Sequence, residues 1–274
     1  MLDTGWNKEY NLVARWYIIY KLIEKRVLIM IFGEYISHRG LHNIQKGVPE
    51  NSLKAFELSC EKNLAIELDV RMTKDGKLVV VHDGNLKRLC GVDVNVSDIY
   101  ADEITEYSIL GTSEKIPLLS QVLKLVNGRV PLMIELKGSW DLFDMERRVC
   151  HLLKKYKGDY AVASFNPATL LWFRIFEPRI NRIQLVSRFK CKCLCKTLLN
   201  KLCAYPFVWK YVTKADFVAC DLRSINEEDV LLTLANNVDL ISWTASNKEL
   251  ARTALDFSNS VIFENLPDDF KFDE

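Results

Sequence analysis

The sequence predicts an α/β fold, specifically a slightly irregular (β/α)8 barrel. Short apolar runs alternate with segments of helix length along most of the chain, as expected for parallel strands joined by helices outside a sheet. Histidine, carboxylate and lysine side chains stand at the ends of several of these runs. The chain has 274 residues, of which 49% are hydrophobic, and this is enough to build a large core.

The first element is a predicted amphipathic helix over residues 8–32. Its apolar residues recur at three- and four-residue steps and are Leu12, Val13, Trp16, Ile19, Tyr20, Ile23 and Val27. We therefore divide the chain into an N-terminal amphipathic helical extension, residues 1–34, and a barrel domain, residues 35–274. The helix either packs on the barrel or lies in a membrane interface.

Strands are predicted wherever a short apolar run stands between turn residues. The runs are residues 36–38, 65–70, 78–82, 131–136, 160–164, 182–186, 217–220, 240–243 and 261–263. Helix-length segments between them include residues 52–62, 141–156 and 226–235. This order, strand then helix, favours a parallel sheet covered by helices.

Nine strand candidates are one more than the barrel uses, so one of them must be wrong or lie outside the barrel. The link over residues 71–77 is too short for a helix, and its Asp75-Gly76 pair is a turn signal. We therefore expect the irregularity of the barrel at this link.

Composition excludes some partners. Lys and Arg number 37 against 36 Asp and Glu, so the net charge of +1 provides no global basic field for nucleic acid. We expect no nucleic-acid partner, and any anion site must be local. The eight cysteines are irregularly spaced, and no secretory signal is recognisable. These features favour reduced thiols and a cytoplasmic location, and they leave peripheral contact with the inner membrane face open.

Glu67 and Asp69 alternate with large apolar residues within the predicted strand 65–70. Alternation places both carboxylates on one face of the strand, about 6 to 7 Å apart. Carboxylates this close repel each other, and a divalent cation relieves the repulsion. Oxygen ligands suit Mg²⁺ or Ca²⁺ better than zinc. A strand with one solvated face is the alternative, and this motif alone leaves both interpretations open.

Glu135 and Lys137 repeat this pattern at the end of the run 131–136. At the carboxyl end of a barrel strand, Glu135 would complete a metal site and Lys137 would face a phosphate group. An ordinary salt bridge is the alternative.

Two of the four histidines also stand at strand ends. His38 is followed by Arg39, and His82 is followed by Asp83. A lone histidine at such a position is usually structural. Two of them, combined with carboxylates, an arginine and a lysine, fit metal-assisted phosphoryl chemistry with a general acid and a general base.

These residues belong to an ordered series of motifs. The series is His38-Arg39-Gly40, Pro49-Glu50-Asn51-Ser52, Ala55-Phe56, Glu67-Leu68-Asp69-Val70, Thr73-Lys74-Asp75-Gly76, His82-Asp83, Ile116-Pro117-Leu118, Glu135-Leu136-Lys137, Ser164-Phe165-Asn166 and Trp243-Thr244. Over residues 35–267 the chain thereby resembles the glycerophosphodiester phosphodiesterase family. The resemblance implies a TIM barrel of the type found in phosphatidylinositol-specific phospholipase C. It also implies hydrolysis of small glycerophosphodiesters from phospholipid turnover to glycerol 3-phosphate and an alcohol.

The resemblance also implies roles for single residues. His38 and His82 look like the acid and base pair, in a reaction that passes through a cyclic phosphate, and which of them is the acid is left open. The implied ligands of one divalent cation, Mg²⁺ or Ca²⁺, are Glu67, Asp69 and Glu135, and the implied substrate contacts are Arg39, Lys137, Glu50 and Trp243. Asn51 would order its loop. A catalytically silent phosphate-binding module would have lost one of these positions, and none is lost.

The chain departs from the family pattern at two places. A turn that usually carries glycine has Asn63, and asparagine tolerates a left-handed backbone. Near the end, Glu264-Asn265 stands where the family tends to have an aspartate before its proline, and either residue is a candidate substitute.

Residues 188–214 carry seven basic side chains and no Asp or Glu. The basic residues are Arg188, Lys190, Lys192, Lys196, Lys201, Lys210 and Lys214. The segment is a solvated surface, a membrane-facing lip for lipid-like substrates, or an anchor site. Its Cys-x-Cys-x-Cys spacing argues against a zinc ribbon. A weak peripheral membrane contact and a lysophospholipase D-like activity on lysophospholipids are therefore the alternative function. The head group and the oligomeric state are left open.

Overall fold

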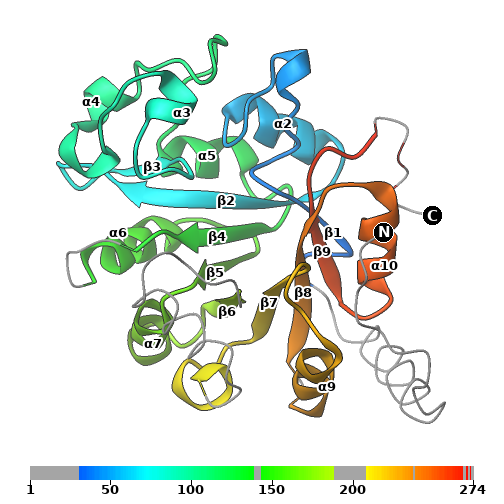
Figure 1. The fold of residues 1–274 in the computed structure, drawn as a ribbon. Helices are drawn as coiled ribbons and strands as arrows, with labels where there is room; N and C mark the ends of the chain where they lie inside the picture. Colours follow the sequence, from blue (N-terminus) through cyan, green and yellow to red (C-terminus); the bar gives the residue numbers. More distant parts are fainter. Residues whose placement is uncertain are drawn as a thin grey trace.

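The computed structural model describes residues 31–138, 143–187, 208–236, 238–267, 270 and 272. Within them the chain forms a closed barrel of eight parallel strands with helices around it, as predicted (Figure 1). The barrel strands are β1 (Tyr35–Ser37), β2 (Ala65–Met72), β4 (Leu132–Leu136), β5 (Tyr160–Ser164), β6 (Asn181–Val186), β7 (Phe217–Asp221), β8 (Asp239–Ala245) and β9 (Ser260–Phe263). Each pairs with the next along the chain, and β1 closes the ring by pairing with both β2 and β9.

The ninth strand, β3 (Leu78–Val80), lies outside the barrel and pairs antiparallel with the end of β2. The link between β2 and β3 contains no helix and turns at Gly76, whose φ of 73° suits glycine. The predicted irregularity is therefore found at this place. The chain passes from β2 into β3 without an intervening helix. Within the barrel the next neighbour of β2 is therefore β4, and the two strands are parallel.

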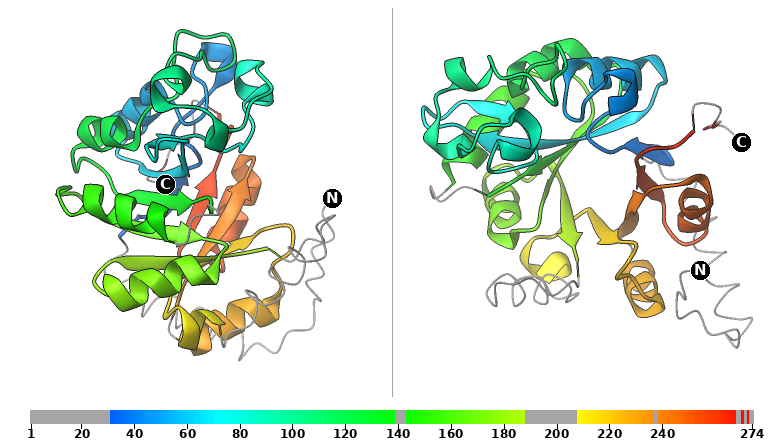
Figure 2. Two further views of the ribbon diagram at one scale, coloured as in Figure 1. Left: turned by 90° about the vertical axis from the view of Figure 1, so that its left-hand side faces the viewer. Right: turned by 45° about the horizontal axis from the view of Figure 1, so that its top comes forward.

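Helices follow most of the strands and form the outer ring (Figures 1 and 2). The longer ones are α2 (Leu53–Glu61), α5 (Leu119–Val126), α6 (Asp144–Leu153), α7 (Pro167–Phe176), α9 (Glu227–Ala235) and α10 (Lys248–Leu255). Shorter turns are η1 (Ile44–Lys46), α3 (Lys87–Cys90), η2 (Val96–Asp98), α4 (Ala101–Ile104) and the π-helical η3 (Val208–Val212). Side-chain caps are found at the starts of α2, α7 and α10. For example, Ser52 accepts a hydrogen bond from the Ala55 N–H at the start of α2.

Three kinds of core hold the barrel together. Small and branched side chains such as Ala161, Ala163 and Ile183 fill the barrel interior, and Phe32 packs with them. Leucine and valine side chains from the outer faces of the strands pack against the helices. A separate small core lies beneath the segment that carries α3 and α4, within residues 79–116. In Figures 1 and 2 this segment lies beside α2 at one rim of the barrel.

Some predictions lie partly or wholly outside the described residues. The helix predicted over residues 8–32 is one of them, so the proposed N-terminal extension stays a prediction. The basic segment 188–214 is described only from Val208 onward. No helix in the part of the chain that the structure describes is both long and apolar enough to cross a bilayer. Among the described cysteines, Cys60, Cys90 and Cys150 are free thiols.

Candidate active site

Three carboxylates meet inside the barrel at the carboxyl end of β2 and β4. The register pairs Asp69 with Glu135, and Glu67 lies two residues earlier on the same face as Asp69. Their exposed fractions are 3% for Glu67, 1% for Asp69 and 7% for Glu135. Ligand oxygens of the three residues all lie within 4.8 Å of one another. The alternative of a strand with one solvated face is therefore wrong, because both carboxylates of β2 are buried.

Lys137 joins this carboxylate group. Its Nζ lies 2.8 Å from Asp69 Oδ1 and 2.7 Å from Glu135 Oε1. Burial alone would lower the pKa of Lys137, but the two carboxylates raise it, so the side chain remains an ammonium. The salt bridge that was the alternative for Glu135 and Lys137 thus exists, and it lies inside the carboxylate group.

The carboxylates carry more negative charge than Lys137 balances. Burial, followed by the charges of Asp69 and Glu135, raises the pKa of Glu67 well above its ordinary value. Burial also raises the pKa of Glu135, although Lys137 opposes this. Burial acts in the same direction on Asp69, but Lys137 and Arg39 outweigh it and lower the pKa of Asp69. A site in which one carboxylate disfavours ionisation is suited to additional positive charge.

Arg39 follows β1 in a left-handed conformation, with φ of 55°. Its backbone N–H donates to Glu67 Oε2 at 2.9 Å. Its side chain donates from Nη1 to Glu50 Oε1 at 2.7 Å, and its Nε lies 3.3 Å from Asp69 Oδ2. The structure therefore brings Arg39 and Glu50 to the carboxylate group.

Asn51 fixes the loop that brings Glu50 to the site. Its Nδ2 donates to Asp69 Oδ2 at 2.8 Å, and its backbone N–H donates to Arg39 O at 2.9 Å. The residue is buried and has a left-handed backbone with φ of 54°. Asn51 thus orders its loop, as predicted, and also orients one of the three carboxylates.

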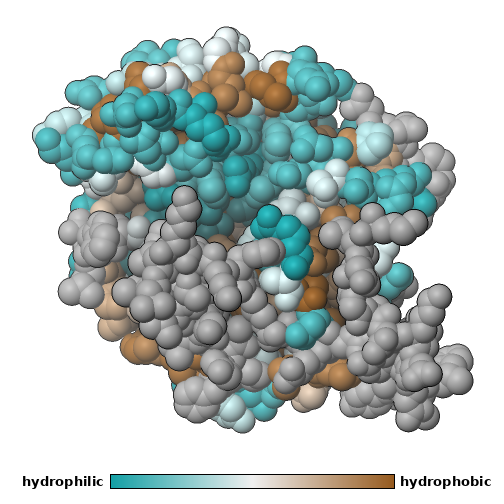
Figure 3. Space-filling view, viewed as in Figure 1, coloured by the Kyte–Doolittle hydropathy of each residue, from teal (hydrophilic) through white to brown (hydrophobic). Residues whose placement is uncertain are grey.

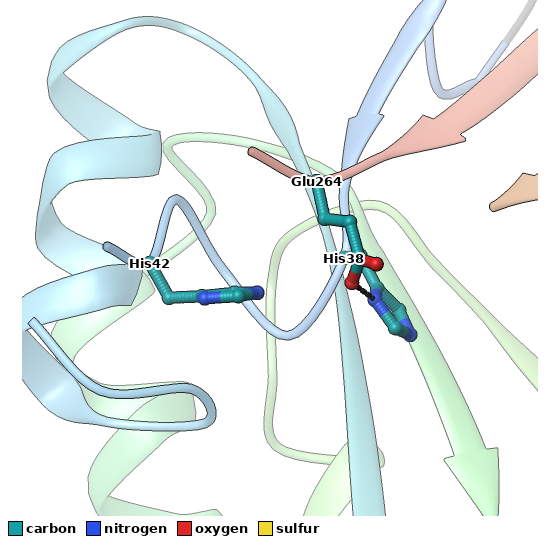
Figure 4. Close-up of side chains that lie close together, drawn as sticks. All are labelled: His38, His42 and Glu264. Carbon is teal, nitrogen blue, oxygen red and sulfur yellow. Dashed lines mark hydrogen bonds and ion pairs between the residues drawn. The ribbon is translucent and has the colours of Figure 1, made fainter. Parts of the chain in front are cut away.

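His38 stands at the junction of β1 and β9. Its backbone N–H donates to Phe263 O at 2.9 Å, and its Nδ1 lies 2.7 Å from Glu264 Oε2 (Figure 4). The hydrogen bond to His38 lowers the pKa of Glu264, against the opposing effect of burial. Between the two candidates for the missing aspartate, Glu264 is the one that contacts His38. Asn265 adopts a left-handed turn with φ of 56°.

His42 lies close to this pair. Figure 4 shows its ring extending from the loop after β1 toward His38 and Glu264. Its Nε2 is buried and has no hydrogen-bond partner among the described residues. Burial, and after it the charge of His38, lowers the pKa of His42. The sequence provided no role for this residue.

His82 follows β3, and its Nδ1 lies 2.7 Å from Asp83 Oδ1. Burial and the positive charge of Lys137 lower the pKa of His82. Although burial opposes the shift, hydrogen bonds from Arg88 and His82 lower the pKa of Asp83 to about 2. His82 and His38 thus share one arrangement, because in each a carboxylate bonds Nδ1 and leaves Nε2 to exchange a proton.

Arg88, at the start of the segment with α3 and α4, was missed by the sequence analysis. Its Nη1 and Nη2 donate to the two carboxylate oxygens of Glu50 at 2.8 Å each, and its Nε donates to Asp83. Burial would raise the pKa of Glu50, but Arg88 and Arg39 lower it to about 2. No local pattern marks Arg88, because its partner Glu50 lies 38 positions away in the chain.

Trp243 on β8 lies inside the barrel with the apolar core there. Its Nε1 donates to Ala219 O at 3.0 Å, and its ring packs edge to face with Phe165 at a centroid distance of 5.8 Å. Its predicted contact with substrate stays a prediction.

Figure 3 shows the molecular surface in the view of Figure 1. Hydrophilic residues gather over the upper part of this surface, where they line a hollow near its centre.

Comparison with known proteins agrees with this geometry. Residues 38–269 match the model of the glycerophosphoryl diester phosphodiesterase family. A glycerophosphodiester phosphodiesterase of Bacillus subtilis (strain 168) is 26% identical over 259 residues, which cover 86% of this chain and 84% of the relative. A lysophospholipase D of Rattus norvegicus is 32% identical over 152 residues, which cover 51% of this chain and 46% of the relative.

A solved structure shares the fold. It is an Oleispira antarctica phosphodiesterase in complex with the product sn-glycerol-3-phosphate, with a TM-score of 0.71 and 19% identity over 85% of this chain and 93% of that chain. The family model extends from the first histidine, His38, to beyond Glu264 and therefore includes every candidate residue of the site. The chain accordingly belongs to the glycerophosphoryl diester phosphodiesterase family and is a phosphodiester hydrolase.

Proposed function

We propose that this protein hydrolyses glycerophosphodiesters to glycerol 3-phosphate and an alcohol, with the help of one divalent cation. One observation supports this most: two carboxylate-bound histidines lie at the same end of the barrel as three buried carboxylates that share a single site. This combination supplies two proton-exchanging groups beside a place for a cation. Membership of the phosphodiesterase family gives the reaction its class.

The donor set of the carboxylate group fits a hard cation. Glu67, Asp69 and Glu135 offer only oxygen, which Mg²⁺ and Ca²⁺ prefer. Burial, and in addition the charge of Asp69, raises the pKa values of Glu67 and Glu135, so a cation beside them would favour their ionised forms. When bound, the cation would draw electron density from a phosphate oxygen and offset the charge that develops there. We assign these three residues as its ligands.

Arg39 and Lys137 supply the remaining positive charge. A phosphodiester carries one negative charge and gains more on its oxygens as it reacts, so cations held in place lower the barrier. Glu50 and Asp69 hold Arg39, and Asp69 and Glu135 hold Lys137. These contacts fix the positively charged side chains of Arg39 and Lys137 before the substrate arrives.

The two histidines would move the protons. In the proposed reaction the neighbouring glycerol hydroxyl attacks phosphorus and forms a cyclic phosphate, which water then opens. One histidine takes the proton from the attacking hydroxyl, and the other protonates the leaving oxygen. Glu264 and Asp83 bond Nδ1 of His38 and His82, so Nε2 of each ring is the atom that exchanges the proton.

Removal of the metal tests the cation site. We expect EDTA to abolish turnover of glycerophosphocholine and other glycerophosphodiesters, and added Mg²⁺ or Ca²⁺ to restore it. The metal should also raise the melting temperature of the wild-type protein, and it should do so much less for Glu67→Gln, because a cation that binds only the folded state stabilises it. Full activity of exhaustively chelated protein would remove the cation from the mechanism.

Substitution of the histidines tests the acid and base pair. His38→Ala and His82→Ala should each lower kcat by about 10² to 10⁴ while leaving the fold intact. His151→Gln is the matched control, because this exposed residue lies on the outer helix α6. Circular dichroism and kcat would be measured for all three variants. Near-normal turnover by a folded His82→Ala protein contradicts the assignment.

A second candidate function is the hydrolysis of lysophospholipids at a membrane surface. The similarity to a lysophospholipase D over 152 residues favours it, although the match covers less than half of that relative. Assays of glycerophosphocholine beside lysophosphatidylcholine separate the two activities. A preference for the lipid substrate would make the lysophospholipase D-like activity the principal one.

A further inference from the structure

We propose that His38, His42 and Glu264 form a zinc site, distinct from the carboxylate group, and that zinc bound there inhibits the enzyme. One ligand atom from each of the three residues lies within 4.8 Å of the other two. Two imidazole nitrogens and one carboxylate oxygen are a donor set that Zn²⁺ uses in proteins, with a fourth position left for water.

His42 has a feature that an ordinary buried histidine lacks. Its Nε2 is buried without a hydrogen-bond partner among the described residues, although buried polar atoms are nearly always paired. Its ring extends toward the pair formed by His38 and Glu264 (Figure 4). A metal ion between the three side chains would give this nitrogen a partner.

The loop that carries His42 is held in place, so the site needs only small side-chain movements. The Leu41 N–H donates to Ser59 Oγ at 2.8 Å, and the His42 N–H donates to Gly40 O at 2.8 Å. His38 and Glu264 follow the paired strands β1 and β9. All three residues are partly exposed, although the Nε2 atom of His42 itself is buried.

The two sites differ in the metals that they favour. Glu67, Asp69 and Glu135 present oxygen only, whereas the second site presents two nitrogens. Imidazole favours zinc over Mg²⁺ and Ca²⁺. Arg39 is the nearby positive charge that opposes zinc, and its ion pairs with Glu50 and Asp69 offset this repulsion.

Inhibition follows from the identity of one ligand, and this part of the inference depends on the proposed role of His38. Zinc on Nδ1 of His38, the atom that faces Glu264, would leave Nε2 as the N–H of a neutral imidazole, which cannot accept a proton and does not readily give one up. Coordination of Glu264 to zinc would also break the hydrogen bond between Glu264 and Nδ1 of His38, which orients the His38 ring. Zinc would therefore stop proton transfer without displacing the cation from the carboxylate group.

Zinc binding is measured first, independently of activity, on the full-length chain in saturating Mg²⁺ by competition with a chromophoric zinc chelator. We expect one tight zinc ion per chain in the wild type and in His151→Gln, and at least tenfold weaker binding in His42→Gln. His42→Leu, which fills a similar space without a ligand atom, serves if His42→Gln does not fold. Equal zinc affinity in the wild type and the folded His42 variant overturns the proposal.

Activity is then measured at saturating Mg²⁺ over a range of zinc concentrations. The half-inhibitory zinc concentration should be at least tenfold higher for the His42 variant than for the wild type and His151→Gln, while basal activity without zinc stays close to that of the wild type. Inhibition that Mg²⁺ relieves and that His42 does not affect would place zinc in the carboxylate group and overturn the proposal. If the protein does not hydrolyse glycerophosphodiesters at all, the binding experiment still decides whether the site exists.

Discussion

Arg88 contacts the carboxylates of Glu50 and Asp83, and each of these carboxylates also bonds a residue of the candidate site. Asp83 bonds His82, Glu50 bonds Arg39, and the Arg88 guanidinium donates to both carboxylates. Arg88 therefore links His82, the proposed general acid or base, to Arg39, the proposed phosphate ligand. Because it acts through these carboxylates, it is a positioning residue.

Replacement of Arg88 should affect turnover more than folding. We expect Arg88→Met to lower kcat by about 10- to 100-fold, as is typical when an outer contact that orients a functional residue is lost. Arg88→Lys should recover only part of this loss, because an ammonium keeps the charge without the paired contact to Glu50. Lys87→Met is the control, since Lys87 is exposed and pairs with Asp93. Equal kcat values for Arg88→Met and Lys87→Met would contradict the positioning role.

The stability effect of the same substitution depends on pH. Glu50 and Asp83 have pKa values lowered to about 2, below the value of about 4 expected in the unfolded chain. Their stabilising contribution is therefore complete above pH 4 and disappears as the pH falls through about 2. Urea unfolding should show that Arg88→Met is most destabilised near neutral pH and that its difference from the wild type shrinks in acid.

At the scale of elements, the loop after β1 carries His38, Arg39 and His42 and depends on close contact with α2. Gly40 has φ of 79°, and a Cβ at this position would meet Ala55 Cβ and Phe56 Cδ1 at 2.9 Å each. Both atoms are buried in the packed face of the helix, so they cannot move aside easily. Glycine is needed here for its conformation and for its size.

Gly40→Ala should therefore be more damaging than the same change at Gly47. Gly47 also has a positive φ, of 68°, but no atom from elsewhere in the described part of the chain lies within 4 Å of its missing Cβ. Gly47→Ala is expected to show only the backbone effect, about 1 kcal/mol, and nearly normal kcat. Gly40→Ala adds the steric conflict and should lower both the melting temperature and kcat. Similar values of both quantities for the two variants would mean that contact with α2 does not fix this loop.

The elements were largely predictable because their signals are local. All nine strand runs correspond to strands, and the short link at residues 71–77 places β3 outside the barrel. Asn63 adopts the left-handed turn expected for it, with φ of 53°. The pairing of His38 with Glu264 could not be predicted with the same certainty, because the two residues are 226 positions apart and meet only when β1 pairs with β9.

At the scale of the whole molecule, the closed barrel brings the carboxyl ends of β1, β2, β4 and β9 together. The site uses side chains from these four strand ends and from the segment after β3. Residues 188–214 follow β6 in the sequence and carry seven basic and no acidic side chains. From this charge imbalance we predict that the segment controls access of lipid-like substrates and takes no part in bond breaking.

Neutralisation of four lysines tests this prediction. Replacing Lys190, Lys192, Lys196 and Lys201 with Gln should weaken binding to anionic vesicles, since each basic residue near such a surface contributes about 1 kcal/mol. Lysophospholipid turnover should slow, whereas hydrolysis of water-soluble glycerophosphocholine should stay nearly unchanged. If the wild-type protein does not bind anionic vesicles even at low salt, the segment is only a solvated surface.

The small apolar core within residues 79–116 has a consequence for the working range of the enzyme. This core is separate from those of the barrel, and the segment that it supports begins immediately before His82. Segments with their own core can open as cooperative units while the rest of a protein stays folded. Such opening would separate His82 from His38 with all eight barrel strands still paired. The temperature at which activity is lost is therefore expected to depend on this small core, and to lie below the temperature at which the barrel unfolds.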